Sequence, residues 1–104
     1  MTEVIFFTEG DLITGFSLSG HTGFAEEGSD IVCASVSSAA YMTANTITDV
    51  LCLNAKIEVD DGYMYLMLNS KDSLEAQTIL KGFRNHITQL CSEYGKYIKV
   101  IIRR

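Results

Sequence analysis

The chain has 104 residues, of which 47% are hydrophobic, and it carries 8 Lys and Arg against 13 Asp and Glu, for a formal net charge of −5. This length is typical of one hydrophobic core, so we expect a single domain over residues 1–104. Three cysteines without a CxxC pair argue against a disulfide framework and a structural zinc site, and favour reduced thiols. No signal-peptide pattern and no apolar run of roughly 18 residues is present, which predicts a cytoplasmic protein with no membrane partner.

The charged residues are unevenly distributed along the chain. Residues 1–55 contain seven acidic residues and no Lys or Arg, whereas residues 56–104 contain six acidic and eight basic residues. An acidic half repels phosphate backbones and attracts cationic peptides, so we expect no direct nucleic-acid binding there. Ordinary solubilising charge is the alternative explanation of the same imbalance.

The chain begins with the pattern of a β-hairpin. Residues 4–8 are apolar and β-prone, residues 9–11 have turn chemistry, and residues 12–19 partly alternate between apolar and small or polar side chains. Gly20 ends the second strand. Gly23 and Gly28 then bracket a short polar loop whose composition permits movement.

A long helix and a second hairpin follow. Apolar residues recur at spacings of three or four, which predicts a helix from about Asp30 to Leu51, capped by Ser29 or Asp30. Residues 56–59 and 63–68 flank an Asp-Asp-Gly turn, and Asp-Gly tolerates the positive φ that a tight turn requires.

A second helix and a final strand complete the predicted elements. Ser70, Asp72 and Ser73 offer capping groups for a helix with a regular apolar line, which Gly95 ends. The β-branched segment from Ile98 to Ile102 predicts a last strand. The order ββαββαβ predicts an α+β fold, in which two helices pack on one face of a mainly antiparallel sheet.

The three cysteines have different settings. Cys91 lies on the apolar line of the second helix and Cys52 adjoins two leucines, so both are predicted to be small core residues. Cys33 lies on the flank of the apolar stripe and in the first turn of the predicted helix. Free N–H groups and the positive end of the helix dipole favour a thiolate there, which makes Cys33 a candidate nucleophile.

One of the two histidines is placed to assist that thiol. His21 precedes Cys33 by twelve residues and lies at the end of a predicted strand, from which its imidazole can reach the helix start across one short loop. A nearby imidazolium lowers a thiol pKa and provides a base. His86 falls in the middle of the second helix, where we expect a structural or surface role.

Other chemistries find little support in the sequence. A zinc site at His21 and Cys33 would need ligands from Glu26, Glu27 or Asp30, none at a recognised spacing. The GxSxG, P-loop, GxGxxG and HExxH patterns do not occur. We therefore expect neither a metal nor an organic cofactor.

These residues give the chain a specific resemblance. It contains Gly20-His21, then Gly28-Ser29-Asp30, then Ile31-Val32-Cys33-Ala34, together with an Ala76-Gln77 pair in the second helix. In this it resembles the ribosomal-processing cysteine protease family, often called Prp or YsxB-like, over essentially its whole length.

The resemblance implies a small homodimeric cysteine endopeptidase with Cys33 as nucleophile and His21 as general base. In that family the substrate is a large-subunit ribosomal protein with a short N-terminal extension, cut after a pair of phenylalanines. The competing hypothesis is a non-enzymatic ribosome-assembly or protein-interaction module in which Cys33 is merely a buried residue at a helix start.

The protease hypothesis assigns roles to residues near the dyad. Backbone N–H groups around residues 31–34 could stabilise a tetrahedral oxyanion. Asp30 would cap the helix or orient His21, and capping is favoured because Asp is common at helix starts. Residues 22–29 would form a lid over an extended peptide. The expected substrate-binding or lid residues are Gly20, Thr22, Gly23, Phe24, Gly28 and Asp30.

Overall fold

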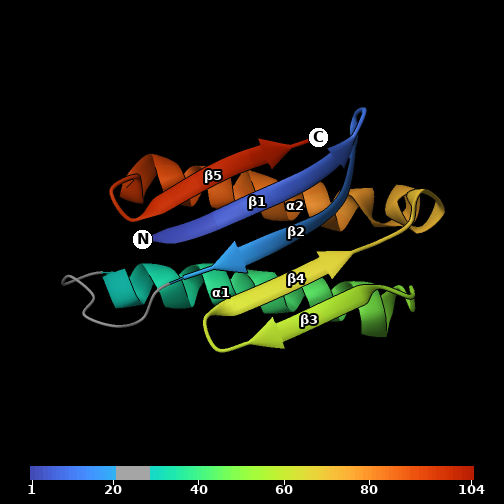
Figure 1. Ribbon diagram of the computed structural model, residues 1–104, viewed down its shortest axis with the longest axis horizontal. Helices are drawn as coiled ribbons and strands as arrows, with labels where there is room; N and C mark the ends of the chain where they lie inside the picture. Colours follow the sequence, from blue (N-terminus) through green and yellow to red (C-terminus); the bar gives the residue numbers. More distant parts are fainter. Residues whose placement is uncertain (21–28) are drawn as a thin grey trace.

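The computed structural model describes residues 1–20 and 29–104, and for residues 29 and 30 only the backbone (Figure 1). The elements follow the order ββαββαβ. They are β1 (Thr2–Glu9), β2 (Leu12–Ser19), α1 (Ser29–Asn45), a π-helical turn η1 (Thr46–Val50), β3 (Lys56–Asp60), β4 (Tyr63–Met67), α2 (Ser70–Tyr94) and β5 (Ile98–Arg103).

The five strands form one sheet in the order β3-β4-β2-β1-β5. All neighbouring strands are antiparallel except β1 and β5, which run parallel with Thr2 opposite Ile98 and Phe7 opposite Arg103. Figure 1 shows both helices behind the sheet, on one face. The α+β fold predicted from the sequence is therefore confirmed.

The core lies between the helices and the inner face of the sheet. Phe83 of α2 packs its ring against the rings of Phe6 on β1 and Phe16 on β2, with centroid separations of 5.6 and 4.8 Å. Val36 of α1 is fully buried in the same cluster. Burial of such side chains contributes about 1.5–3 kcal/mol each and holds the helices on the sheet.

A bulge in β2 explains why its apolar residues only partly alternate. Phe7 pairs with Gly15 and Thr8 pairs with Ile13, so Thr14 is an extra residue on β2. Because the bulge shifts the alternation by one, Ile13 and Phe16 both face the core and both are fully buried. Both predicted glycine turns are present. Gly10, between β1 and β2, has φ +61°, and Gly62, between β3 and β4, has φ +68°.

The helix limits differ from the predicted ones in detail. α1 begins at Ser29, one residue before the expected start, and the predicted capping by Ser29 or Asp30 involves side chains outside the described residues. The helical path ends in η1, where the N–H of Leu51 donates to the carbonyl of Thr46 over 2.8 Å. The cap of α2 was predicted wrongly: it is Asn69, whose side chain accepts from the N–H of Asp72 over 2.8 Å.

Cys52 and Cys91 lie in different environments. Cys52 is exposed and has φ +56°, so the prediction that it is a core residue is wrong; the chain turns outward immediately after η1. Cys91 is half-buried against the core, and its thiol donates to the carbonyl of Ile98 over 3.6 Å. Cys91 therefore has the structural role that was expected.

Candidate active site

The thiol of Cys33 lies against the end of β2. A Cβ atom built on Gly20 would be 3.2 Å from Cys33 Sγ and 3.4 Å from Thr2 Oγ1, closer than most real side-chain contacts. Cys33 is half-buried. The absence of a side chain at Gly20 is thus what allows the half-buried thiol to lie directly beside the strand end that leads into His21.

The turn between β3 and β4 supports Gly20 from the other side. The N–H of Gly20 donates to the carbonyl of Gly62 over 2.9 Å. A Cβ atom on Gly62 would lie 2.7 Å from the carbonyl oxygen of Gly20, too close for any side chain. Two glycines in contact therefore fix the backbone next to the thiol, and the adjacent Asp60 and Asp61 bring two exposed carboxylates to this end of the molecule.

The position of Cys33 within α1 differs from the prediction. Because the helix begins at Ser29, Cys33 is its fifth residue and starts the second turn rather than lying in the first. In a helix with this start, the N–H groups of Cys33 and Ala34 face the carbonyls of Ser29 and Asp30. Of the predicted oxyanion donors at residues 31–34, the N–H of Ile31 is the one that belongs to the unpaired first turn.

Several predicted site residues lie outside the described part of the chain. These are His21, Thr22, Gly23, Phe24 and Gly28, and the side chain of Asp30. The expected histidine base, the lid over residues 22–29 and the capping or orienting role of Asp30 therefore stay predictions. Gly20 is the candidate binding residue that the structure places beside Cys33.

Sequence reasoning missed two neighbours of Gly20, Thr2 and Gly62. Thr2 is buried at the start of β1, and its N–H donates to the carbonyl of Tyr97 over 2.8 Å. Both residues reach the site through long-range strand pairing, which no local pattern encodes. The Asp-Asp-Gly turn was predicted as a hairpin signal, and a structural role beside the cysteine was not part of that prediction.

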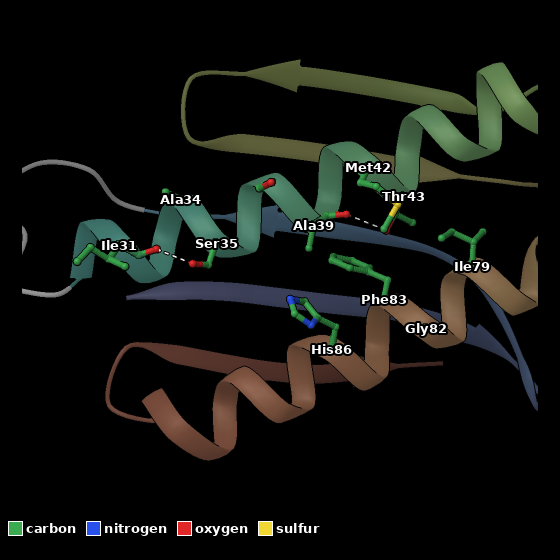
Figure 2. Close-up of a pocket in the computed structure, with 11 residues that line it drawn as sticks. Ile31, Ala34, Ser35, Ala39, Met42, Thr43, Ile79, Gly82, Phe83 and His86 are labelled. Atoms are coloured by element: carbon green, nitrogen blue, oxygen red, sulfur yellow. Dashed lines mark hydrogen bonds between the residues drawn. The ribbon is translucent and has the colours of Figure 1, made fainter.

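A larger hollow lies between α1 and α2 on the side away from the sheet (Figure 2). It has a volume of about 840 Å³ and is lined by Ile31 and Met42 of α1, which are 71% and 54% exposed, and by Phe83 and His86 of α2. On an α-helix, Ile31 is about 160° around the axis from Cys33, so this groove does not open onto the thiol.

His86 is exposed and lines this groove, in agreement with the surface role expected for it. The hydroxyls of Ser35 and Thr43 donate to the carbonyls of Ile31 and Ala39 within α1, over 2.9 and 2.8 Å (Figure 2). These polar groups are therefore engaged inside the helix, and the groove offers mainly apolar surface.

The described residues offer neither a metal-binding cluster nor a membrane-spanning helix. Across residues 1–20 and 29–104, no group of three or more His, Cys, Asp and Glu side chains is arranged to hold a metal ion. Within the same residues, neither helix combines the length and the apolar character that crossing a bilayer would require.

The chain is similar to proteins of known activity. The ribosomal processing cysteine protease Prp of Bacillus subtilis (strain 168) is 26% identical over 94 residues, which cover 85% of this chain and 84% of that protein. A crystal structure of the essential ribosomal processing protease Prp from S. aureus in complex with a substrate peptide has a TM-score of 0.90 at 24% identity, covering 99% of this chain and 100% of that one.

A second S. aureus Prp structure, in complex with a covalently linked product peptide, has a TM-score of 0.84 at 25% identity, with 99% of this chain and 100% of that chain covered. Residues 1–99 match the family described as "Cysteine protease Prp". With the match extending over nearly the whole sequence, the chain belongs to the cysteine protease Prp family.

Proposed function

We propose that this protein is a cysteine endopeptidase in which Cys33 is the nucleophile and His21 the general base. The contact between Cys33 Sγ and the Gly20 position carries the proposal. His21 is joined to Gly20 by one peptide bond, which separates consecutive Cα atoms by about 3.8 Å. An imidazole on the residue after Gly20 is therefore within reach of the thiol.

The reaction follows from these two groups. His21 takes the thiol proton, and the Cys33 thiolate attacks the scissile carbonyl to give a tetrahedral oxyanion. Backbone N–H groups near the start of α1 are the proposed donors to that oxyanion. The amine leaves with the proton from His21, and water activated by His21 then hydrolyses the thioester and restores the thiol.

The proposed substrate is a large-subunit ribosomal protein that carries a short N-terminal extension. The support is the family membership and the ribosomal processing named for the relatives. Incubation of the unprocessed ribosomal protein with this enzyme, followed by mass spectrometry, should show loss of the N-terminal segment after a pair of phenylalanines. An unchanged mass with active enzyme would contradict the substrate and leave the protease assignment intact.

The dyad is tested by substitution. Cys33→Ser and His21→Ala should each reduce peptide cleavage by at least about a thousandfold, because the first removes the thiol nucleophile and the second removes its base. Cys52→Ser and Cys91→Ser are the matched controls and should retain activity. Circular dichroism should show the same fold in all four variants, and wild-type turnover by Cys33→Ser would contradict the assignment.

We propose that residues 22–29 close over bound peptide, with Phe24 as the apolar contact. The sequence supports this by its two glycines and adjacent Glu26 and Glu27. Hydrogen exchange on a Cys33→Ala background, with and without a substrate peptide, should show protection of this segment only when peptide is present. Equal protection in both samples would contradict the lid.

We also propose that the protein is a homodimer whose subunits meet through the groove between α1 and α2. The support is the family resemblance and the exposed apolar surface around Met42. Met42→Glu should lower the mass measured by sedimentation equilibrium to that of a monomer. Leu74→Glu, at an α2 position that is 63% exposed and does not line the groove, is the control and should leave the mass unchanged.

A further inference from the structure

A second pocket lies at the end of the molecule opposite Cys33. It has a volume of about 470 Å³ and is formed by the turn between β1 and β2, one side of α2 and the end of β5. The polar side chains that line it are those of Thr8, Asp11, Lys81, Arg84 and Arg104, and we call this hollow the basic pocket. Thr2, which neighbours Gly20 at the candidate active site, and Thr8 are six residues apart on β1, which places the two sites about 20 Å apart.

The charge of the basic pocket is positive although the chain as a whole is acidic. Lys81 and Arg84 come from α2 and Arg104 from the residue after β5, and Asp11 is the acidic side chain in the described lining. Among residues 1–20 and 29–104, none of these three cations has an ion pair within 4.0 Å. Three cations from two separate segments thus surround one hollow without carboxylate partners in the described structure.

Thr8 adds a hydrogen-bonding group to the same pocket. Its Oγ1 atom is buried and has no hydrogen-bond partner among the described residues. A buried hydroxyl without a partner costs about 1–3 kcal/mol, so such groups are rare and normally meet a protein atom, water or a ligand. Thr8 is paired with Ile13 beside the β2 bulge, which fixes its side chain on the inner face of the sheet, toward α2.

The helix side of the basic pocket is fixed by Gln77. Its side chain accepts from the N–H of Ile13 over 3.0 Å and donates to the carbonyl of Ile13 over 2.7 Å. Lys81 follows Gln77 by four residues and Arg84 by seven, so all three lie on the same side of α2. The paired hydrogen bonds therefore hold the two cations next to the β1–β2 turn.

We propose that the basic pocket binds a phosphate group. A phosphate presents several acceptor oxygens in a tetrahedral arrangement, which suits donors that converge from a strand, a helix and the chain after β5 better than a planar carboxylate does. Arginine is suited to paired hydrogen bonds with phosphate, and lysine contributes a point charge. The phosphate comes from a free phosphate ester or ion, or from a nucleic-acid backbone, and the two sources are separable by experiment.

The first experiment titrates inorganic phosphate into the ¹⁵N-labelled full-length protein at constant ionic strength maintained with chloride. The amide signals of Thr8, Gly10 and Asp11 should shift saturably. The double variant Lys81→Gln/Arg84→Gln should lose the effect, whereas Lys71→Gln, an exposed cation on the same helix outside the pocket, should keep it. No saturable shift with either phosphate or RNA, or an unchanged shift in the double variant, would overturn the proposal.

The second experiment uses Thr8→Val, which replaces the hydroxyl by a methyl of similar size. Phosphate binding should weaken about tenfold, the effect of one hydrogen bond to a charged group. Stability without phosphate should stay the same or rise, because an unpartnered buried hydroxyl is removed. Unchanged phosphate affinity would overturn the role of Thr8.

The third experiment separates the two sources with a decamer of single-stranded uridylate. Binding of the RNA more tightly than inorganic phosphate, with an affinity that falls as salt rises, identifies the backbone as the source. Binding of inorganic phosphate without binding of the RNA identifies a free phosphate ion or ester. Either result supports the phosphate site. Equal RNA affinity for wild type and Lys81→Gln/Arg84→Gln would exclude this pocket as the RNA contact.

Discussion

The two ends of strand β1 carry sites that are built in different ways. At its start, Thr2 lies near Gly20, and the site depends on the free space at Gly20. A Cβ atom added there would lie only 3.2 Å from Cys33 Sγ. At its other end, Thr8 lies in the basic pocket, whose proposed binding depends on positive charge and on a hydroxyl without a partner among the described residues. Substitutions that add volume should therefore affect the first site most, and substitutions that remove charge should affect the second.

The largest effect is expected from adding volume at Gly20. Gly20→Val should reduce kcat for peptide cleavage by about a hundredfold, because displacing a reacting group by about 1 Å can have this effect. Gly10→Asn is the control: a Cβ at Gly10 would meet nothing within 4 Å, and Asn tolerates φ +61°. Normal kcat in Gly20→Val would show that the strand end is not part of the site.

The next largest effect is expected on the rates at which the three cysteines are alkylated. By exposure alone, Cys52 should react first, because it is exposed while Cys33 and Cys91 are half-buried. If Cys33 is activated as a thiolate, iodoacetamide should modify it at least about tenfold faster than Cys52. Peptide mass mapping over time measures the order. Rates that follow exposure would favour the non-enzymatic interaction module instead.

A smaller effect is expected on stability from the turn that supports Gly20. Gly62→Ala should lower the free energy of unfolding by about 1–3 kcal/mol, because φ is +68° and the new Cβ would lie 2.7 Å from the Gly20 carbonyl. Gly10→Asn, at a position where a Cβ atom would meet nothing within 4 Å, is the control and should change it by less than about 0.5 kcal/mol. Urea unfolding measures both. Equal stability of the Gly62 variant would contradict the close contact.

The smallest effect is expected on the salt dependence of kcat/KM, from the carboxylates of Asp60 and Asp61 at the end of the molecule that holds Cys33. For a peptide rich in Lys and Arg, kcat/KM should fall about threefold from about 0.01 to about 0.15 M ionic strength, as the screening length shortens from about 30 to about 8 Å. Asp60→Asn/Asp61→Asn should flatten this dependence, and Glu75→Gln on α2 should not. Salt-independent kcat/KM in the wild type would leave the acidic residues a purely solubilising role.

Local patterns predicted the strands and helices of this fold well because each has a clear period. The line of apolar residues through α2 gives a regular helical face, and the Asp-Asp-Gly sequence gives the turn before β4. The cap at Asn69 was missed because Ser70, Asp72 and Ser73 offer the same chemistry within four residues. Propensity cannot separate such close alternatives, whereas the geometry of the Asp72 N–H does.

The candidate site was predictable only where sequence neighbours define it. Cys33 was identified by its place at a helix start, and Gly20 by its place before a histidine. The contacts with Thr2 and Gly62 depend on pairing between strands far apart in the chain. Cys52 was misplaced because its leucine neighbours suggest a core, although the positive φ after η1 turns its side chain outward. The basic pocket likewise joins residues that lie up to 96 positions apart.

The place of β1 between β2 and β5 also constrains when the protein can fold during its own synthesis. Translation delivers β2 early, but the parallel partner of β1 spans Ile98–Arg103 and emerges only after all the other elements. Until then one edge of β1 is left open to other chains, and the hydrogen bond from the Thr2 N–H to the Tyr97 carbonyl is missing. The sheet, and with it the surroundings of Cys33, is therefore completed after the nascent chain has passed Ile98, so a stalled or truncated product carries the cysteine without its finished environment.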